Sequence, residues 1–142
     1  MTIWILVASG SAARLFRHDR EAGLVEIEDF LNPANRRHEG DLVEDQAGRA
    51  RTRATDQSES YDEPDAREQE RERFARTLCD RLEQAHHQGE FDALYLVSGD
   101  AFLGLLREHL DAEVARGVRG EVHKNLVRLR PEEIRPHLPD RL

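Results

Sequence analysis

The stretch Ile3-Trp4-Ile5-Leu6-Val7-Ala8, followed at once by Ser9-Gly10-Ser11, decides the fold class of this chain. A continuous apolar run is typical of a strand buried on both faces, and the Ser-Gly-Ser step that ends it has turn chemistry. Residues 91–97 form a second run of the same kind. We therefore expect one mixed sheet in which the first run is central and the second lies parallel beside it.

Two further strands follow the first run. Leu15 and Phe16 mark a short strand within residues 13–17, and the apolar residues of 24–30 mark another. Because the connections are short, these three strands are expected to form an antiparallel meander, which Asn32-Pro33 closes.

A long loop is predicted at about residues 34–61, where the chain is polar and has neither helical nor strand periodicity. Loops of this length inside a compact domain are commonly functional or disordered, and the composition predicts the most mobile part of the chain. Ser60-Tyr61-Asp62-Glu63 then fits a capping box, with Pro64 in the first turn of a helix. The apolar face of that helix is carried by Phe74, Leu78, Leu82 and Ala85, and Gly89 ends it.

The remaining elements alternate. Ser98-Gly99-Asp100 leads into a helix with Phe102, Leu103, Leu106 and Leu110 at helical spacing, residues 117–123 supply a last strand, and Pro131 starts a short helix. The expected order is β-β-β-α-β-α-β-α, in a single α/β domain over residues 1–142 with helices on both faces of the sheet. That order is also the order of the ribonuclease H fold.

Composition limits the class of function. The formal charge is −8, so any site for a polyanion must be local. Cys79 is the single cysteine, so nothing demands an oxidising compartment. The apolar opening lacks a basic region before it, and no segment approaches the ~20 apolar residues of a membrane helix. We expect a soluble, cytoplasmic protein that does not contact membranes.

For each candidate catalytic side chain, the sequence pattern favours a structural role over a catalytic one. The first strand carries no carboxylate, which disfavours a two-metal nuclease, and Asp100 is interpreted as a helix cap. The histidines lack the spacing of a zinc site, and no elbow sequence makes Ser9 or Ser11 a nucleophile. Cys79 lies on the apolar helix face, which indicates a buried, inert thiol. We therefore predict no catalytic residue, no cofactor and no stoichiometric metal.

The predicted loop has the most distinctive chemistry. It sets five arginines against acidic residues that include Glu39, Asp41, Glu44 and Asp45; the arginines are Arg36, Arg37, Arg49, Arg51 and Arg53. Arginine is suited to bidentate recognition of phosphate or carboxylate. A solvated loop of mixed charge is the alternative reading, and composition alone leaves both open.

Several motifs together resemble the bacterial host attachment protein family, described as required for attachment to host cells. They extend over most of the chain and are Trp4-Ile5-Leu6-Val7-Ala8, Ala13-Arg14-Leu15-Phe16, Asn32-Pro33, Asp45-Gln46-Ala47-Gly48-Arg49, Glu72-Arg73-Phe74-Ala75, Phe102-Leu103-Gly104-Leu105-Leu106-Arg107 and His123-Lys124-Asn125-Leu126-Val127. Two positions depart from the family pattern, which has Pro at Ala47 and Asp at Asn125.

That family is itself similar to the middle domain of archaeal and eukaryotic peptide-chain release factors, which has a ribonuclease H-like core. In those factors the comparable loop carries a Gly-Gly-Gln tip that promotes peptidyl-tRNA hydrolysis. Here the loop has Gln46-Ala47-Gly48-Arg49, so the resemblance does not imply release activity. It does imply that the loop is the working surface, with Gly48 and Arg49 as its best candidates.

Three functions follow as hypotheses. The first is a non-catalytic binding protein of release-factor-like ancestry, whose loop contacts RNA, the ribosome or another anionic partner. The alternative is an interaction protein with a protein partner, supporting attachment to host cells or surfaces indirectly. A hydrolase acting through the loop is the third. The binding residues of the first hypothesis are Arg36, Arg37, Gln46, Gly48, Arg49, Arg51 and Arg53.

Overall fold

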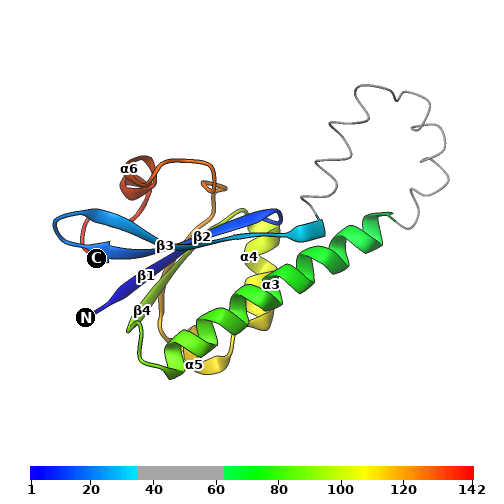
Figure 1. The fold of residues 1–142 in the computed structure, drawn as a ribbon, viewed down its shortest axis with the longest axis horizontal. Helices are drawn as coiled ribbons and strands as arrows, with labels where there is room; N and C mark the ends of the chain where they lie inside the picture. The colour runs from blue at the N-terminus through cyan, green and yellow to red at the C-terminus, as the bar shows by residue number, and fades with distance from the viewer. Residues whose placement is uncertain (35–62) are drawn as a thin grey trace.

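The structure is a computed structural model that describes residues 1–34 and 63–142. In these two stretches, one mixed sheet contains five strands in the order β3-β2-β1-β4-β5 (Figure 1). The strands are β1 (Ile3–Ala8), β2 (Ala12–Asp19), β3 (Gly23–Leu31), β4 (Ala93–Ser98) and β5 (Val118–Val122). Strand β2 is antiparallel to both of its neighbours, whereas β1, β4 and β5 pair in parallel.

The two apolar runs form the centre of the sheet, as predicted. β1 lies between β2 and β4, with Ile3 opposite Ala93 and Ala8 opposite Ser98, and all residues of both strands are buried. The second strand begins two residues later than the apolar run suggests. Phe91 precedes it and stacks on Trp4, with the ring centroids 4.9 Å apart.

The antiparallel meander is confirmed, and its second and third strands are longer than predicted. Asp19 Oδ1 accepts hydrogen bonds from the backbone N–H groups of Glu21 and Ala22, and Gly23 has a φ of 82°, so the chain reverses within a few residues. The register shifts opposite Leu15 and Phe16, which leaves Ile27 of β3 as the extra residue of a bulge.

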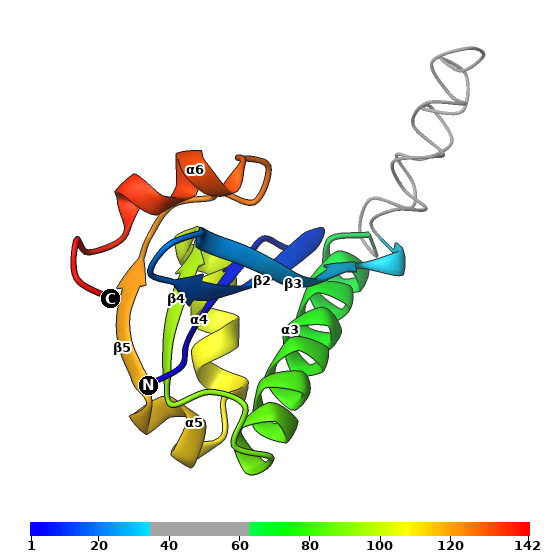
Figure 2. The same ribbon diagram turned by 60° about the vertical axis from the view of Figure 1, so that its left-hand side comes forward.

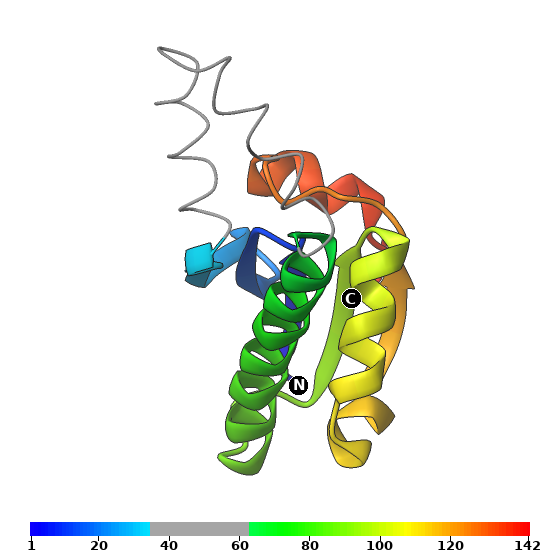
Figure 3. The ribbon, with the colours of Figure 1, turned by 90° about the vertical axis from the view of Figure 1, so that its right-hand side faces the viewer.

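Helices cover both faces of the sheet (Figures 2 and 3). One face packs against α3 (Glu63–His87), α4 (Asp100–His109) and α5 (Ala112–Arg116). The other packs against α6 (Pro131–Ile134) and against Leu138, which follows the 3-10 turn η1 (Arg135–His137). Trp4 and Leu6 belong to the first core, and Ile5 and Val7 to the second, because side chains alternate along a strand.

The long helix has the predicted apolar face. Phe74, Leu78, Leu82 and Ala85 are all buried against the sheet and α4. Cys79 is buried as well, and burial raises the pKa of its thiol to about 12, which leaves it protonated and unreactive at neutral pH. The predicted capping residues Ser60–Asp62 and the predicted loop at 34–61, apart from Ala34, lie outside the described residues.

Two local expectations were wrong or incomplete. Asp100 is not the cap of α4: Gly99 occupies that position, no side chain caps the helix, and Asp100 is its first residue. The short helix α5 was not predicted, because its five residues are too few to show a helical period. Asp111 caps α5 by accepting a hydrogen bond from the backbone N–H of Glu113.

Truncation of Ile134 tests the smaller core under α6. Ile134 is fully buried, so Ile134→Ala should lower the free energy of unfolding by about 2 to 5 kcal/mol in urea denaturation. Leu31→Ala is the matched control: that side chain is 56% exposed, and its loss should cost less than about 1 kcal/mol. Equal losses for the two variants would contradict the described packing of α6 on the sheet.

Candidate functional site

Four strands end at the same edge of the sheet. β1, β3, β4 and β5 point the same way, so residues 9–11, Asn32, 98–100 and 123–125 gather there, and we call this the carboxyl edge (Figure 1). The chain also leaves the first described stretch at Ala34 and re-enters at the start of α3 on this edge. In open α/β sheets, ligands bind beyond the carboxyl ends of the strands.

Asn32 locks this edge together. Its side chain is only 3% exposed; Nδ2 donates to the carbonyl oxygens of Gly10 (3.0 Å) and Glu70 (3.4 Å), and Oδ1 accepts from the N–H of Ala34 (3.2 Å). The backbone N–H of Asn32 donates to the carbonyl of Ser11. One amide thus joins the end of β3 to the β1–β2 turn and to α3, and we call these contacts the Asn32 clamp.

The turn after β1 is built from hydroxyl groups and a glycine. Ser9 Oγ accepts from the N–H groups of Ser11 and Ala12 and lies 3.2 Å from Ser11 Oγ, so both serines have structural partners. A Cβ on Gly10 would come within 3.0 Å of Arg71 Cδ. The missing side chain therefore lets the stem of Arg71 cross this turn.

An ionic network lies where β4 and β5 end. His123 Nδ1 is 2.7 Å from Asp100 Oδ1, and His123 Nε2 is 3.5 Å from Glu121 Oε1. Arg107 of α4 pairs with the same Glu121 through two nitrogens. The hydrogen bond from Arg107 lowers the pKa of the Glu121 carboxyl below its ordinary value of 4.5, and the neighbouring His123 lowers it further.

This network was missed by the sequence analysis, and it is not a catalytic triad. Ser98 follows Val97, which pairs with Val122, so the parallel register brings Ser98 and His123 to adjacent strand ends. Yet Ser98 Oγ is fully buried and makes no hydrogen bond within the described part of the chain. A serine nucleophile needs a hydrogen bond to its base and an open path to substrate, and Ser98 has neither.

The predicted binding residues are not placed by the structure. Arg36, Arg37, Gln46, Gly48, Arg49, Arg51 and Arg53 all lie between the two described stretches. Three other arginines stand at the carboxyl edge: Arg71 and Arg73 on α3, and Arg128 after β5. All three are exposed, and their guanidinium groups make no ion pair with any residue of the described ranges.

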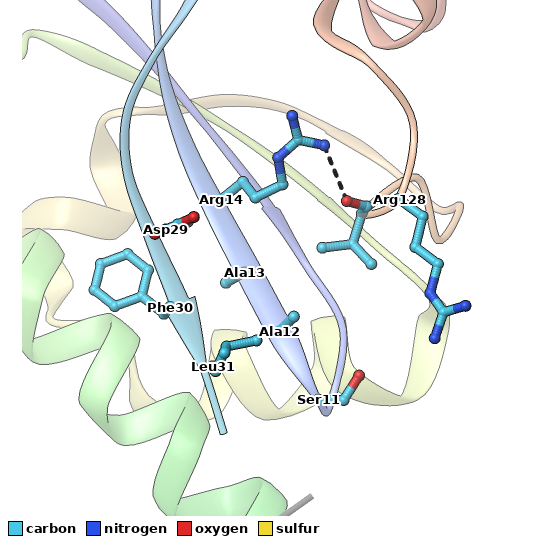
Figure 4. A pocket seen from close by; sticks show the side chains of 9 residues that line it. Ser11, Ala12, Ala13, Arg14, Asp29, Phe30, Leu31 and Arg128 are labelled. Atoms are coloured by element: carbon cyan, nitrogen blue, oxygen red, sulfur yellow. Dashed lines mark hydrogen bonds between the residues drawn. The ribbon is translucent and has the colours of Figure 1, made fainter. Parts of the chain in front are cut away.

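Two hollows flank the end of β3, one on each face of the sheet. The first has a volume of about 350 Å³ and lies between the end of β3, the Asn32 clamp and α3, next to Arg73 and Phe74. The second has a volume of about 430 Å³ and lies between β2, β3 and the loop after β5, next to Arg14 and Arg128 (Figure 4). Among the residues described, no three His, Cys, Asp or Glu side chains are grouped to hold a metal ion.

The fold and this edge define a mixed α/β protein with a polar surface at the carboxyl ends of its strands. The sequence model of the family described as "Protein required for attachment to host cells" matches residues 4–138, so the chain belongs to that family. The resemblance seen in the motifs is thereby confirmed. A search of curated proteins finds no match. None of the described helices is both long and apolar enough to cross a membrane.

The motif residues that carried the resemblance have structural roles at this edge. Asn32 forms the clamp, and Arg14 donates to the carbonyls of Val127 and Leu129 in the loop after β5. Asn125 Oδ1 accepts from the N–H of Val127 at 3.3 Å. An Asp would offer the same acceptor, so Asn at this departing position preserves the turn.

A change of Asn32 tests the clamp. Asn32→Asp removes both donors and sets a buried carboxylate against the carbonyls of Gly10 and Glu70, so the free energy of unfolding should fall by about 3 kcal/mol. Asn125→Asp is the matched control, because its exposed side chain only accepts a hydrogen bond, and it should cost less than about 1 kcal/mol. Similar losses in urea denaturation for both variants would rule out the clamp.

The Glu121 network should make stability depend on pH. Because the folded-state pKa of Glu121 is lowered, its contribution is present above the ordinary value of 4.5 and is lost as the pH falls through the folded-state value. Glu121→Gln should therefore be less stable than the parent protein at pH 7, with the difference narrowing below pH 4.5. Glu108→Gln, on the exposed side of α4, should track the parent at every pH. A constant difference for Glu121→Gln would contradict the network.

Proposed function

We propose that this protein is a non-catalytic binding protein that contacts an anionic partner at the carboxyl edge. The observation that carries the proposal is the Asn32 clamp. It ties the end of β3, just before residue 35, to Glu70 of α3, and so fixes the two described elements that flank the arginine-rich stretch. A fixed base lowers the entropy cost of presenting such a stretch to a partner.

Charge supports the choice of an anionic partner. Arg71 and Arg73 are exposed and unpaired in the described ranges, and they stand on the helix that follows the predicted binding residues. The segment itself supplies Arg36, Arg37, Gln46, Gly48, Arg49, Arg51 and Arg53 as the proposed contacts. Guanidinium groups bind phosphate and carboxylate oxygens in pairs, so a local cluster can bind an anion on a chain whose formal charge is −8.

Release-factor-like ancestry belongs to the same proposal. The strand order β3-β2-β1-β4-β5, with β2 antiparallel, is the arrangement expected of a ribonuclease H-like core and supports that ancestry. It points to RNA or the ribosome, in the cytoplasm, as the partner. Since Gln46-Ala47-Gly48-Arg49 lacks the Gly-Gly-Gln tip, binding rather than peptidyl-tRNA hydrolysis is the proposed activity.

The family description favours a second candidate function. A protein required for attachment to host cells can act as an interaction protein that supports attachment through a protein partner. The two candidates differ in what the native protein captures. Ribosomal RNA and ribosomal proteins support the first, and envelope components support the second. A hydrolase is the least supported, because the buried Ser98 Oγ makes no hydrogen bond to His123 or to any other residue of the described ranges.

Paired charge reversals test the working surface. Arg49→Glu with Arg51→Glu, and separately Arg71→Glu with Arg73→Glu, should each weaken binding of the captured partner, by about 1.5 to 3 kcal/mol per desolvated contact. For an RNA partner, the salt dependence of the affinity should also become shallower. The measurement is a titration with the captured partner at several salt concentrations.

The control uses two exposed arginines at the far end of the molecule. Arg116 ends α5, and Arg119 is the second residue of β5, so both lie at the opposite end of that strand from the carboxyl edge (Figure 2 labels α5 and β5). Arg116→Glu with Arg119→Glu should leave the affinity unchanged if the carboxyl edge is the contact surface. Equal weakening by this control would mean a diffuse charge effect, and unchanged binding in both test variants would refute the proposal.

A further inference from the structure

The hollow of about 430 Å³ on the α6 face of the sheet is not used by the proposed function. Its floor is formed by β2 and β3, with Ala12 and Leu31 side by side in the strand register. Its wall is formed by Val127 and Arg128 of the loop after β5 (Figure 4). The volume lies within the range of about 300 to 1,000 Å³ that is usual for small-molecule sites.

Arg14 builds the hollow rather than serving as its binding group. One nitrogen of its guanidinium donates to the carbonyl oxygens of Val127, at 3.0 Å, and Leu129, and the other two donate to Glu26. The side chain of Arg14 is 19% exposed, and its charge is neutralised by Glu26 at 3.0 Å. These contacts hold the wall against the floor, so the hollow exists before any ligand binds and needs little ordering.

Two charged groups of opposite sign remain free at the hollow. Asp29 of β3 and Arg128 of the loop are exposed, and neither forms an ion pair with another residue in the described ranges. Figure 4 shows Asp29 on the β3 side and Arg128 on the loop side, with β2 between them, which carries Ala12, Ala13 and the side chain of Arg14. The hollow is therefore neutral overall, with a negative and a positive end.

The apolar floor is itself unusually open. Leu31 is 56% exposed, and in the described ranges only Met1 and Ile27 are further large apolar side chains classed as exposed. Covering Leu31 would remove apolar surface from water, which favours binding by roughly 25 cal/mol per Å² buried. A matching ligand carries an ammonium and a carboxylate that are separated by an apolar body.

We propose that this hollow binds a short apolar peptide with free termini, of two or three residues. Its ammonium group pairs with Asp29, its carboxylate accepts a bidentate pair of hydrogen bonds from Arg128, and its side chains cover Leu31 and Val127. A dipeptide or tripeptide carries its two charges on different residues, with apolar side chains between them. The proposal does not rest on the contacts proposed for Arg71, Arg73 and the arginines of residues 36–53.

Calorimetric titration of the full chain with leucine peptides tests the site. Dileucine or trileucine with free termini should bind saturably, and the N-acetylated and C-amidated forms should bind at least tenfold more weakly. The proposal would be overturned if the N-acetylated or the C-amidated peptide bound as strongly as the free peptide. Failure of both free peptides to bind at millimolar concentration would overturn it as well.

Two variants test which side chain binds each terminus. Asp29→Asn should bind the free and the N-acetylated peptide equally, because the ammonium has lost its partner, and should still bind the C-amidated peptide more weakly. Arg128→Gln should bind the free and the C-amidated peptide equally and should still bind the N-acetylated peptide more weakly. Arg116→Gln, an exposed arginine on α5, is the control and should keep both preferences. Circular dichroism checks the fold, and variants that retain the parent's preferences would refute the assignment.

Discussion

The parallel pairing of β1 with β4 is the interaction on which the rest of the structure depends. The two strands are in register from Ile3 opposite Ala93 to Ala8 opposite Ser98, and all of their residues are buried. A pair of strands hidden on both faces needs a layer of helices on each side. The long α3 with α4 supplies one layer, and the short α6 supplies the other. The same pairing aligns the strand ends, which gathers polar side chains at the carboxyl edge.

The carboxyl edge shows how buried polar groups position a surface. Asn32 places every hydrogen-bonding group of its amide on backbone atoms of three separate segments. One nitrogen of Arg14 donates to two backbone carbonyls of the loop after β5, and the other two donate to Glu26. These two side chains serve as cross-links, whereas Arg71, Arg73 and Arg128 remain exposed around them. A rigid edge that carries unpaired arginines is suited to binding an anion. The conformational entropy of the edge is lost when the protein folds, so little more is lost when the partner binds.

Membership of the family required for attachment to host cells names a biological process without naming a chemical step. The described residues agree with a binding role in one respect: most hydroxyl, imidazole and carboxylate groups at the carboxyl edge are engaged in turns and ion pairs, and the exception, Ser98, is fully buried. Ser9 and Ser11 support the β1–β2 turn, and His123 is held between Asp100 and Glu121. Fold alone does not set a function, so the partner has to be identified from the surface it binds.

The sequence by itself determined the mixed sheet, its two central strands, the antiparallel meander and the apolar face of α3, because the spacing of apolar residues within each segment predicts it. It also determined the family, through motifs such as Asn32-Pro33. It did not determine the role of Asp100, which was predicted to be a cap and instead pairs with His123, 23 residues away along the chain. The clamp, the ionic network and the hollow beside Arg14 were decided only by tertiary structure, because they join residues from strands and helices whose adjacency no local pattern encodes.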